Sequence, residues 1–433
     1  MSDRLPALAL AGALLLASAL GGCRPELDLL PLAQTNADEG TTYATASDSY
    51  GDIFAAFWQG MSENYLYWDA EPAGYWDAVW RAYKPRFDAL GPYPANAEAA
   101  RQHIADMVAP LCDGHLHISF ESGLSLSSVS PSADRIEKRF TDNPGRDNPK
   151  ETFYRNNWSG TPSALNASNW NYWEGCIRPG YIIDEGLRAG ADSLHIALGK
   201  IDDDGGGDGY IAYLSFNEFT ITENLGSNPS GFIGTYLSRV TDAQCMGVIF
   251  DLRGNTGGYN ADIPLLLSPL LAGDLHFAWT RTKKGVNRLD YAPTLPYVVR
   301  ANPAGAHRAA NAGRMPLAAL VDDYTISCAE LLSLAIRATG GRLIGTTTWG
   351  AVGLRVGDAS PVITHGGSFT HNKLWTGVVQ AGLQAQGLNG EVFEGVGLEP
   401  DERIEFNLSA FASGTDAQLE AAIAYVRGLT AGG

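Results

Sequence analysis

Apolar residues recur at helical spacing in three short stretches near the start of the chain. They fall between residues 53 and 61, between 76 and 83, and between 99 and 107. Side chains three and four positions apart lie on one face of a helix, so each stretch predicts a short amphipathic helix. We therefore expect an N-terminal helical bundle over residues 50–121, whose last helix leads into a strand from Leu116 to Phe120.

From residue 209 onward, apolar runs typical of strands alternate with helical patterns. We expect strands at 209–216, 247–253, 276–282, 316–322 and 342–348, and helices at 232–240, 262–271 and 327–339. Short connections between alternating strands and helices are typical of a parallel or mixed sheet covered by helices. The pattern predicts an α/β core over residues 209–433 that ends in a helix, with its chemistry at the carboxyl ends of the strands.

The segment between these two regions, residues 122–208, shows neither pattern and is rich in Ser, Asn, Pro and Gly. We treat it as a divergent insert and assign it no fold. Its acidic, glycine-rich stretch from Asp202 to Asp208 predicts a hairpin turn. A calcium loop is the weaker interpretation, because the helix-loop-helix ligand pattern is missing.

The amino terminus carries a targeting pattern. Arg4 precedes an apolar run from Leu5 to Leu20, which is short and Ala-rich for a membrane span and predicts a signal peptide over residues 1–22. The sequence Leu20-Gly21-Gly22-Cys23 resembles the lipobox of bacterial lipoproteins, so Cys23 is expected to carry a lipid. An ordinary secretory signal, with Cys23 incidental, is the alternative. Residues 23–49 lack a repeating apolar face and predict a flexible tether.

Charge and cysteine content narrow the partners and the compartment. The formal net charge of -18 would repel phosphates, so nucleic acid is not an expected partner. Beyond Cys23 the chain has Cys112, Cys176, Cys245 and Cys328, which allow three disulfide pairings in an oxidising compartment. No C-x-x-C pair indicates a zinc site.

Two loops follow expected strands at their carboxyl ends, at residues 253–258 and 323–330. In the second loop Ser327 opens a helix, where the helix dipole and the amides of the first turn can stabilise an oxyanion. Glu330 follows three positions later, and this pair also forms a helix capping box. Taken alone, the pair favours a helix cap over a nucleophile.

Several segments in order resemble the family of C-terminal processing peptidases and tricorn-like serine peptidases. They are Asn64-Tyr65, Trp76, Tyr83, and residues 111–115, 248–258, 316–322, 325–330, 343–350 and 394–401. The resemblance covers about residues 50–120 and 209–402. It implies a crotonase-like α/β core with ββα units and a mixed sheet, as in interphotoreceptor retinoid-binding protein. It also implies a serine peptidase that acts on peptides or proteins and needs no cofactor. Processing peptidases usually carry a PDZ domain, and we find no clear PDZ signature between Phe120 and Gly209.

The family contains two catalytic designs. Processing peptidases use a Ser-Lys dyad, and the position of that lysine, after Trp349-Gly350, is Ala351 in this chain. The only later lysine, Lys373, falls outside the motif. The tricorn-like branch uses a histidine from the end of the helical region, and His115 stands in that motif.

The resemblance therefore implies that His115 takes the proton of Ser327 and returns it to the leaving amine. Glu394 matches the carboxylate that supports this histidine. The tricorn design has a serine before the histidine, where this chain has Gly114. Glu394 could then reach His115 directly, through water or through another hydroxyl.

For the oxyanion, the resemblance points to the backbone amide of Gly257 or Gly258 together with that of Cys328. Glycine lets a substrate carbonyl approach its N–H closely, although a tight strand-to-helix turn would also require glycine. A phosphate-binding loop is disfavoured because no lysine follows these glycines.

Two other functions remain open from the sequence. Asp113, His115 and His117 alternate and could point to one face of a strand as metal ligands. The chain could also be a surface lipoprotein that keeps the fold and binds a peptide or hydrophobic ligand without cleaving it. The resemblance to a bacterial family brings a sorting rule for lipoproteins, under which Arg24 at the second mature position, in place of Asp, implies an anchor in the outer membrane of the cell envelope.

Overall fold

The N-terminal helices form as the sequence predicts. In the computed structural model, which describes residues 41–149, 182–191, 194–202, 209–225, 231–302, 315–355 and 366–430, they are α2 (Tyr50–Asn64), α3 (Tyr75–Asp88) and α4 (Ala97–Val108). Their apolar faces join one buried cluster that includes Phe57, Trp76 and Met107. The three helices therefore share one core, as the predicted bundle requires.

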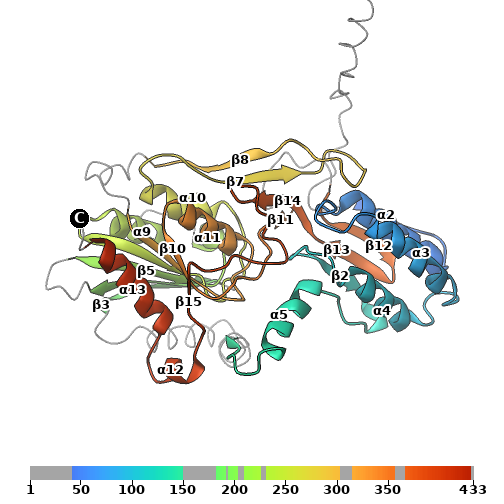
Figure 1. Cartoon of the computed structure of the whole chain (residues 1–433), viewed down its shortest axis with the longest axis horizontal. Helices are drawn as coiled ribbons and strands as arrows, with labels where there is room; N and C mark the ends of the chain where they lie inside the picture. The colour runs from blue at the N-terminus through green and yellow to red at the C-terminus, as the bar shows by residue number, and fades with distance from the viewer. Residues whose placement is uncertain are drawn as a thin grey trace, which may run out of the picture. The chain divides into compact units, whose positions relative to one another are not determined.

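The helical region is completed by strands from far along the chain. A four-stranded sheet has the order β1-β12-β13-β2, and the strands are β1 (Thr41–Thr42), β12 (Phe369–Lys373), β13 (Trp375–Val379) and β2 (His117–Phe120). Trp375 of β13 meets Phe57 of α2 edge to face, with ring centroids 5.5 Å apart. Figure 1 shows these late strands, in orange, beside the early helices, in blue. This sheet fixes the segment that precedes β2.

The core is a seven-stranded mixed sheet, in agreement with the predicted α/β class. Its order is β15-β10-β9-β6-β5-β4-β3. The strands are β3 (Ile182–Ala191), β4 (Leu194–Asp202), β5 (Tyr210–Phe216), β6 (Cys245–Asp251), β9 (Leu317–Val321), β10 (Arg342–Gly345) and β15 (Glu402–Arg403). The strands from β5 to β15 pair in parallel, whereas β3 and β4 are antiparallel. The carboxyl ends of β6 and β9 therefore lie at the same edge.

Helices cover both faces of this sheet (Figure 1). The helices on one face are α9 (Phe232–Thr241), α10 (Asp262–Leu267) and α11 (Cys328–Ala338), and their apolar residues join the larger core cluster. On the other face α13 (Ala417–Thr430) packs on residues such as Ile249 and Leu320. Alternate residues of β6 and β9 belong to the two clusters, because successive side chains of a strand point to opposite faces.

A third sheet is antiparallel and has the order β11-β14-β7-β8. Its strands are β11 (Leu354–Arg355), β14 (Ala381–Gln386), β7 (Leu275–Thr282) and β8 (Leu295–Val299). The predicted strand at 276–282 is thus real but lies outside the central sheet. The described helices are completed by α5 (Pro131–Thr141), α8 (Ile221–Leu225) and α12 (Leu408–Ala412), with 3-10 turns η1 (Ser122–Leu124) and η3 (Ser268–Leu270).

Part of the segment 122–208 acquires a fold that the sequence pattern did not reveal. It contributes α5 and the antiparallel strands β3 and β4, which extend the central sheet. The residues between Asp202 and Gly209 lie outside the described part of the chain, and β4 and β5 pair antiparallel on either side of them. The predicted signal peptide, Cys23 and the tether up to residue 40 also lie outside the described residues. No helix of the described residues has the length and apolar character to cross a membrane.

Candidate active site

Ser327 occupies a sharp turn between β9 and α11. Its backbone has φ 58° and ψ -119°, a combination that residues with a side chain rarely adopt. Thr325 holds the turn, because its hydroxyl donates to the carbonyl of Leu252 at 2.9 Å and accepts from the N–H of Asp322 at 2.9 Å. The turn places the Ser327 hydroxyl at the edge of the sheet, and the residue is 9% exposed.

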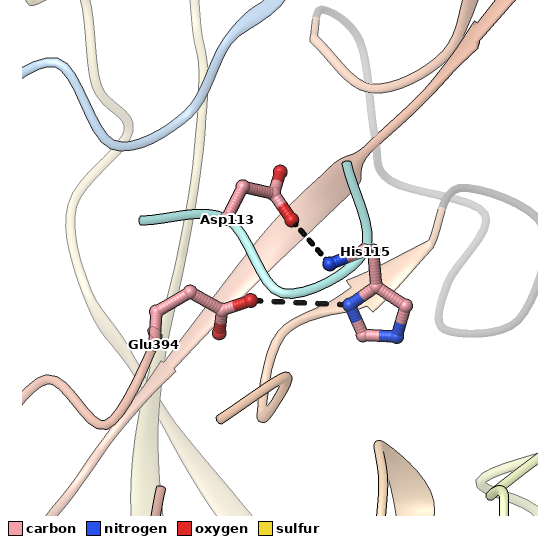
Figure 2. Close-up of side chains that lie close together, drawn as sticks. All are labelled: Asp113, His115 and Glu394. Atoms are coloured by element: carbon pink, nitrogen blue, oxygen red, sulfur yellow. Dashed lines mark hydrogen bonds and ion pairs between the residues drawn. The ribbon is translucent and has the colours of Figure 1, made fainter. Parts of the chain in front are cut away.

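His115 reaches this hydroxyl from the end of the helical region. Its Nε2 lies 3.1 Å from Ser327 Oγ, although the two residues are 212 positions apart. Asp113 fixes the turn that carries His115, because one carboxylate oxygen accepts the His115 N–H at 2.7 Å (Figure 2). The other oxygen accepts the N–H of Ala381 at 2.9 Å. The pair Ser327 and His115 therefore has the geometry of a nucleophile and its base.

Glu394 lies on the other side of the imidazole. Figure 2 shows its carboxylate pointing at His115 Nδ1, and its Oε1 lies 3.9 Å from that nitrogen. This distance is an ion-pair contact and is too long for a hydrogen bond. Backbone N–H groups hold the carboxylate in place: Gly114 donates to Oε1 at 2.8 Å and Gly353 donates to Oε2 at 2.9 Å.

The structure explains why glycine precedes His115. A Cβ atom on Gly114 would lie 2.2 Å from the carbonyl oxygen of Gly350 and 2.5 Å from Cα of Ala351. A serine therefore does not fit at position 114 unless this backbone moves. The sequence left open whether Glu394 reaches His115 directly, through water or through another hydroxyl. In the structure the carboxylate and the imidazole are in direct electrostatic contact.

The surrounding carboxylates determine the electrostatics of the imidazole. Burial lowers the pKa of His115, but the negative charges of Glu394, Asp113 and Glu330 outweigh burial and raise the pKa above its ordinary value. Burial, and then the charge of Glu394, raise the pKa of Asp113 to about 7. The site therefore stabilises the protonated, positively charged form of His115 more than water does.

The glycine loop after β6 packs directly against the Ser327 turn. A Cβ on Gly257, whose φ is 83°, would lie 2.6 Å from Cβ of Ser327 and 2.9 Å from the nitrogen of Cys328. The Gly257 N–H is occupied, because it donates to the side-chain oxygen of Asn255 at 2.9 Å. Gly258 has φ 140°, and a Cβ there would lie 2.5 Å from the carbonyl oxygen of Phe219. Of the two glycines, the geometry favours Gly258 as the oxyanion donor with Cys328, and it gives Gly257 a packing role.

Arg253 anchors this loop, a role that sequence reasoning missed. Its buried guanidinium forms ion pairs with Asp251 at 2.6 Å and with Asp416 at 2.8 Å. It also donates to the side chain of Gln418 at 2.9 Å. The loop is thereby held at the start of α13. No local sequence pattern could reveal this link, because Asp416 lies 163 positions after Arg253.

A cleft of about 490 Å³ opens over these groups. Its lining includes His115, Ser327 and Gly258, together with the charged residues Glu218, Glu223 and Arg355. An open cleft above a hydroxyl, an imidazole and backbone amides has the components that acyl transfer requires.

The alternative metal site that the sequence leaves open can be compared with the structure. Asp113, His115 and Glu394 offer ligand atoms within 4.8 Å of one another, and His117 is not a member of this group. Both carboxylates already accept backbone N–H bonds. Among the described residues, the alternative set Asp113, His115 and His117 forms no such group, and His117 lies on β2, two residues beyond His115.

No disulfide joins any two of the three described cysteines, Cys112, Cys245 and Cys328. Each of the three possible two-disulfide pairings needs one such bond, since Cys176 can bind only one partner. None of these pairings is therefore present. Cys328 instead places its Sγ 2.9 Å from the carbonyl oxygen of Gly258.

Comparisons with known proteins agree with this architecture. The model of peptidase family S41 matches residues 208–402. Among solved structures, a candidate peptidase from Parabacteroides merdae has a TM-score of 0.59 at 19% identity, covering 88% of this chain and 97% of that chain. Mature CPAF, solved in complex with lactacystin, has a TM-score of 0.54 at 12% identity, covering 88% and 98%. At such identities the two structures show a shared fold. The curated proteins contain no significant match.

Proposed function

On the premise that the core of this chain, residues 208–402, belongs to peptidase family S41, we propose that the protein is a serine peptidase that cleaves peptide bonds through an acyl-enzyme. The observation that carries the proposal is the 3.1 Å contact between His115 Nε2 and Ser327 Oγ. A serine hydroxyl is a weak nucleophile until an adjacent base takes its proton, and this contact supplies the base.

In the proposed mechanism, Ser327 Oγ attacks the carbonyl carbon of the scissile bond while its proton moves to His115 Nε2. Glu394, 3.9 Å from Nδ1, stabilises the imidazolium that results. The N–H groups of Gly258 and Cys328 bind the oxyanion of the tetrahedral intermediate. His115 then protonates the leaving amine, and the same residue activates the water that releases the acyl group.

A lysine base does not fit this arrangement. Ala351 stands at the position where a processing peptidase carries its lysine. The ammonium of Lys373 lies on β12, where it pairs with Asp48 and donates to the carbonyl of Ser47. We therefore assign the chain to the histidine-based design.

The proposal is tested by hydrolysis of a fluorescently quenched, unstructured polypeptide by the mature chain. Ser327→Ala should abolish cleavage. Ser333→Ala is the matched control, because Ser333 is a buried serine on the helix that Ser327 opens, and its hydroxyl donates to the carbonyl of Ala329 at 2.7 Å within that helix. Cleavage that persists in Ser327→Ala would contradict the proposal. A parent chain that binds the peptide and leaves it intact would favour the peptide-binding lipoprotein instead.

We further propose that the peptidase acts at the bacterial cell envelope, held by a lipid on Cys23 and with Arg24 directing it to the outer membrane. The lipobox-like Leu20-Gly21-Gly22-Cys23 supports this location. Mass spectrometry of the N-terminal peptide should find acylated Cys23, and Cys23→Ser should move the protein to the soluble fraction. An unmodified cysteine in membrane-bound protein would contradict the anchor.

A further inference from the structure

Glu330 does more in this fold than cap a helix. The residue is fully buried on the first turn of α11 and accepts four hydrogen bonds, two on each carboxylate oxygen. Oε2 accepts the N–H of Ser327 at 3.1 Å and that of Ala351 at 2.7 Å. Oε1 accepts the hydroxyl of Thr348 at 2.5 Å and the N–H of Gly350 at 2.8 Å.

The bond to Ser327 is the one that a capping box requires. The other three go to residues 348–351, which belong to a different part of the site. Gly350 accepts the N–H of Gly395, the neighbour of Glu394, at 2.8 Å. The same carbonyl is the atom on which Gly114 packs. One carboxylate thus joins the backbone of the nucleophile to the segment that supports both Glu394 and the turn before His115.

From this arrangement we infer that Glu330 is a positioning residue, which must be an ionised carboxylate for Ser327 to face His115. The inference rests on the proposed peptidase function and concerns how that site is regulated. Both oxygens receive backbone N–H groups, so a carboxylate satisfies all four donors. With an amide at this position, the NH2 group would face the N–H of Gly350 in one orientation, or those of Ser327 and Ala351 in the other.

The same network links the site to pH. The pKa of Glu330 is raised to about 7, because the effect of burial exceeds the opposing effect of the hydrogen bonds from Thr348, Ala351 and Gly350. The titratable groups around it are Glu394, whose charge raises the pKa of Glu330, and His115. Protonation removes the charge that strengthens all four hydrogen bonds, and three of their donors are backbone N–H groups, which cannot accept a bond from the new O–H. We expect the Ser327 turn to lose its fixed position as pH falls through this range.

The decisive experiment measures the rate at which a fluorophosphonate labels Ser327 between pH 5 and 9. Thr348→Val removes one hydrogen bond that lowers the pKa of Glu330, and Thr348 hydrogen-bonds to neither His115 nor Ser327. The midpoint of the acid limb should move to higher pH, so that labelling at pH 6 slows about tenfold while labelling at pH 9 stays within about threefold of the parent. Thr348→Ser keeps the hydroxyl and should restore the parent midpoint.

Glu330→Gln provides an independent measurement. We expect the labelling rate and kcat to fall by about 10-fold to 100-fold. KM should change by less than about threefold, because the change displaces the nucleophile and leaves the residues that bind substrate in place. Glu399→Gln is the matched control, since its largely exposed carboxylate accepts from Thr347 on the same loop.

If the midpoint of the acid limb is the same in Thr348→Val as in the parent, the inference about Glu330 is wrong. This measurement tests the inference even if Glu330→Gln does not fold. A folded Glu330→Gln with the labelling rate of the parent overturns it as well. If the parent chain is labelled and the variants are labelled like the parent, only the role of Glu330 is contradicted. A folded parent chain that is never labelled contradicts the proposed peptidase and, with it, this inference.

Discussion

His115 Nε2 and Ser327 Oγ lie 3.1 Å apart because strands from the last third of the chain hold the helical region against the core. β13 pairs with β2, with Val379 opposite His117, and Ala381 at the start of β14 donates its N–H to Asp113. The chain segment from β13 to β14 thus passes directly behind the turn that bears the imidazole. The site depends on both regions being folded together, and the described residues between 41 and 430 lie in one compact unit.

Replacement of the imidazole should remove general base catalysis. We expect His115→Asn to lower kcat by about 10²-fold to 10⁴-fold, the range that a positioned proton acceptor contributes. Hydrolysis rates of a quenched peptide measure the loss. His103→Asn is the matched control, since His103 packs on Tyr83 and Phe87 in the helical region and should leave kcat unchanged. Equal losses in the two variants would point to damage of the helical region as a whole.

The pH dependence of the rate should respond to Glu394. His115 acts as a base only when neutral, and Glu330 positions Ser327 only when ionised. The pKa of each group is raised, so the rate of the parent chain should rise with pH as both lose their protons, with a midpoint above 6.5. Glu394→Gln removes the nearest negative charge, which lowers the pKa of His115 and moves this midpoint to lower pH. The maximal rate should fall about tenfold or more, because the imidazolium loses its partner. Glu391→Gln, a largely solvent-exposed change on the same loop, should keep the parent midpoint. A midpoint that stays in place in Glu394→Gln would exclude the electrostatic link.

The glycine loop should tolerate no side chain at the proposed oxyanion donor. Gly258→Ala forces a Cβ to within 2.5 Å of the Phe219 carbonyl at φ 140°. The loop must shift, so we expect kcat to fall about 10²-fold, as when an oxyanion donor is lost. Gly273→Ala serves as control, because a Cβ there meets no atom within 4 Å. Parent-like kcat in Gly258→Ala would remove this residue from the oxyanion site.

The Arg253 cluster should contribute to stability. Arg253→Met leaves Asp251 and Asp416 buried without their cation, and such a loss costs about 3–5 kcal/mol of the free energy of unfolding. Arg403→Met breaks ion pairs that are half exposed to solvent, and we expect a cost below about 1 kcal/mol. Urea unfolding followed by tryptophan fluorescence compares the two variants. Similar costs for both would mean that solvent screens the Arg253 cluster as it screens a surface pair.

Local patterns predicted much of the core and part of the site. The alternation of apolar runs placed β5, β6, β9, β10 and α11 close to their observed bounds, and the helix that Ser327 opens begins one residue after it. The pairing of β12 and β13 with β1 and β2 was not predicted, since contacts between residues more than 250 positions apart leave no local periodicity. The strands β3 and β4 were missed because residues 122–208 carry no clear alternation.

The sequence could identify candidate site residues, but it could not predict the backbone hydrogen bonds and close contacts that these residues make. The occupied N–H of Gly257 and the space that excludes a side chain at Gly114 depend on atoms from distant segments. The sequence assigned Asp113 no part in the proposed catalytic site, and its contacts with His115 and Ala381 show that it holds the turn before the imidazole. The roles of Ser327, His115 and Glu394 in catalysis stay predictions until they are tested in solution.

The most direct test of the account is labelling of the folded, mature chain by a fluorophosphonate, followed by peptide mapping. We expect a single adduct on Ser327, formed rapidly in the parent chain, slowly in His115→Asn and not at all in Ser327→Ala. An adduct on another residue, or a folded parent chain that takes up no label at any pH between 5 and 9, would contradict the assignment of Ser327 as the nucleophile.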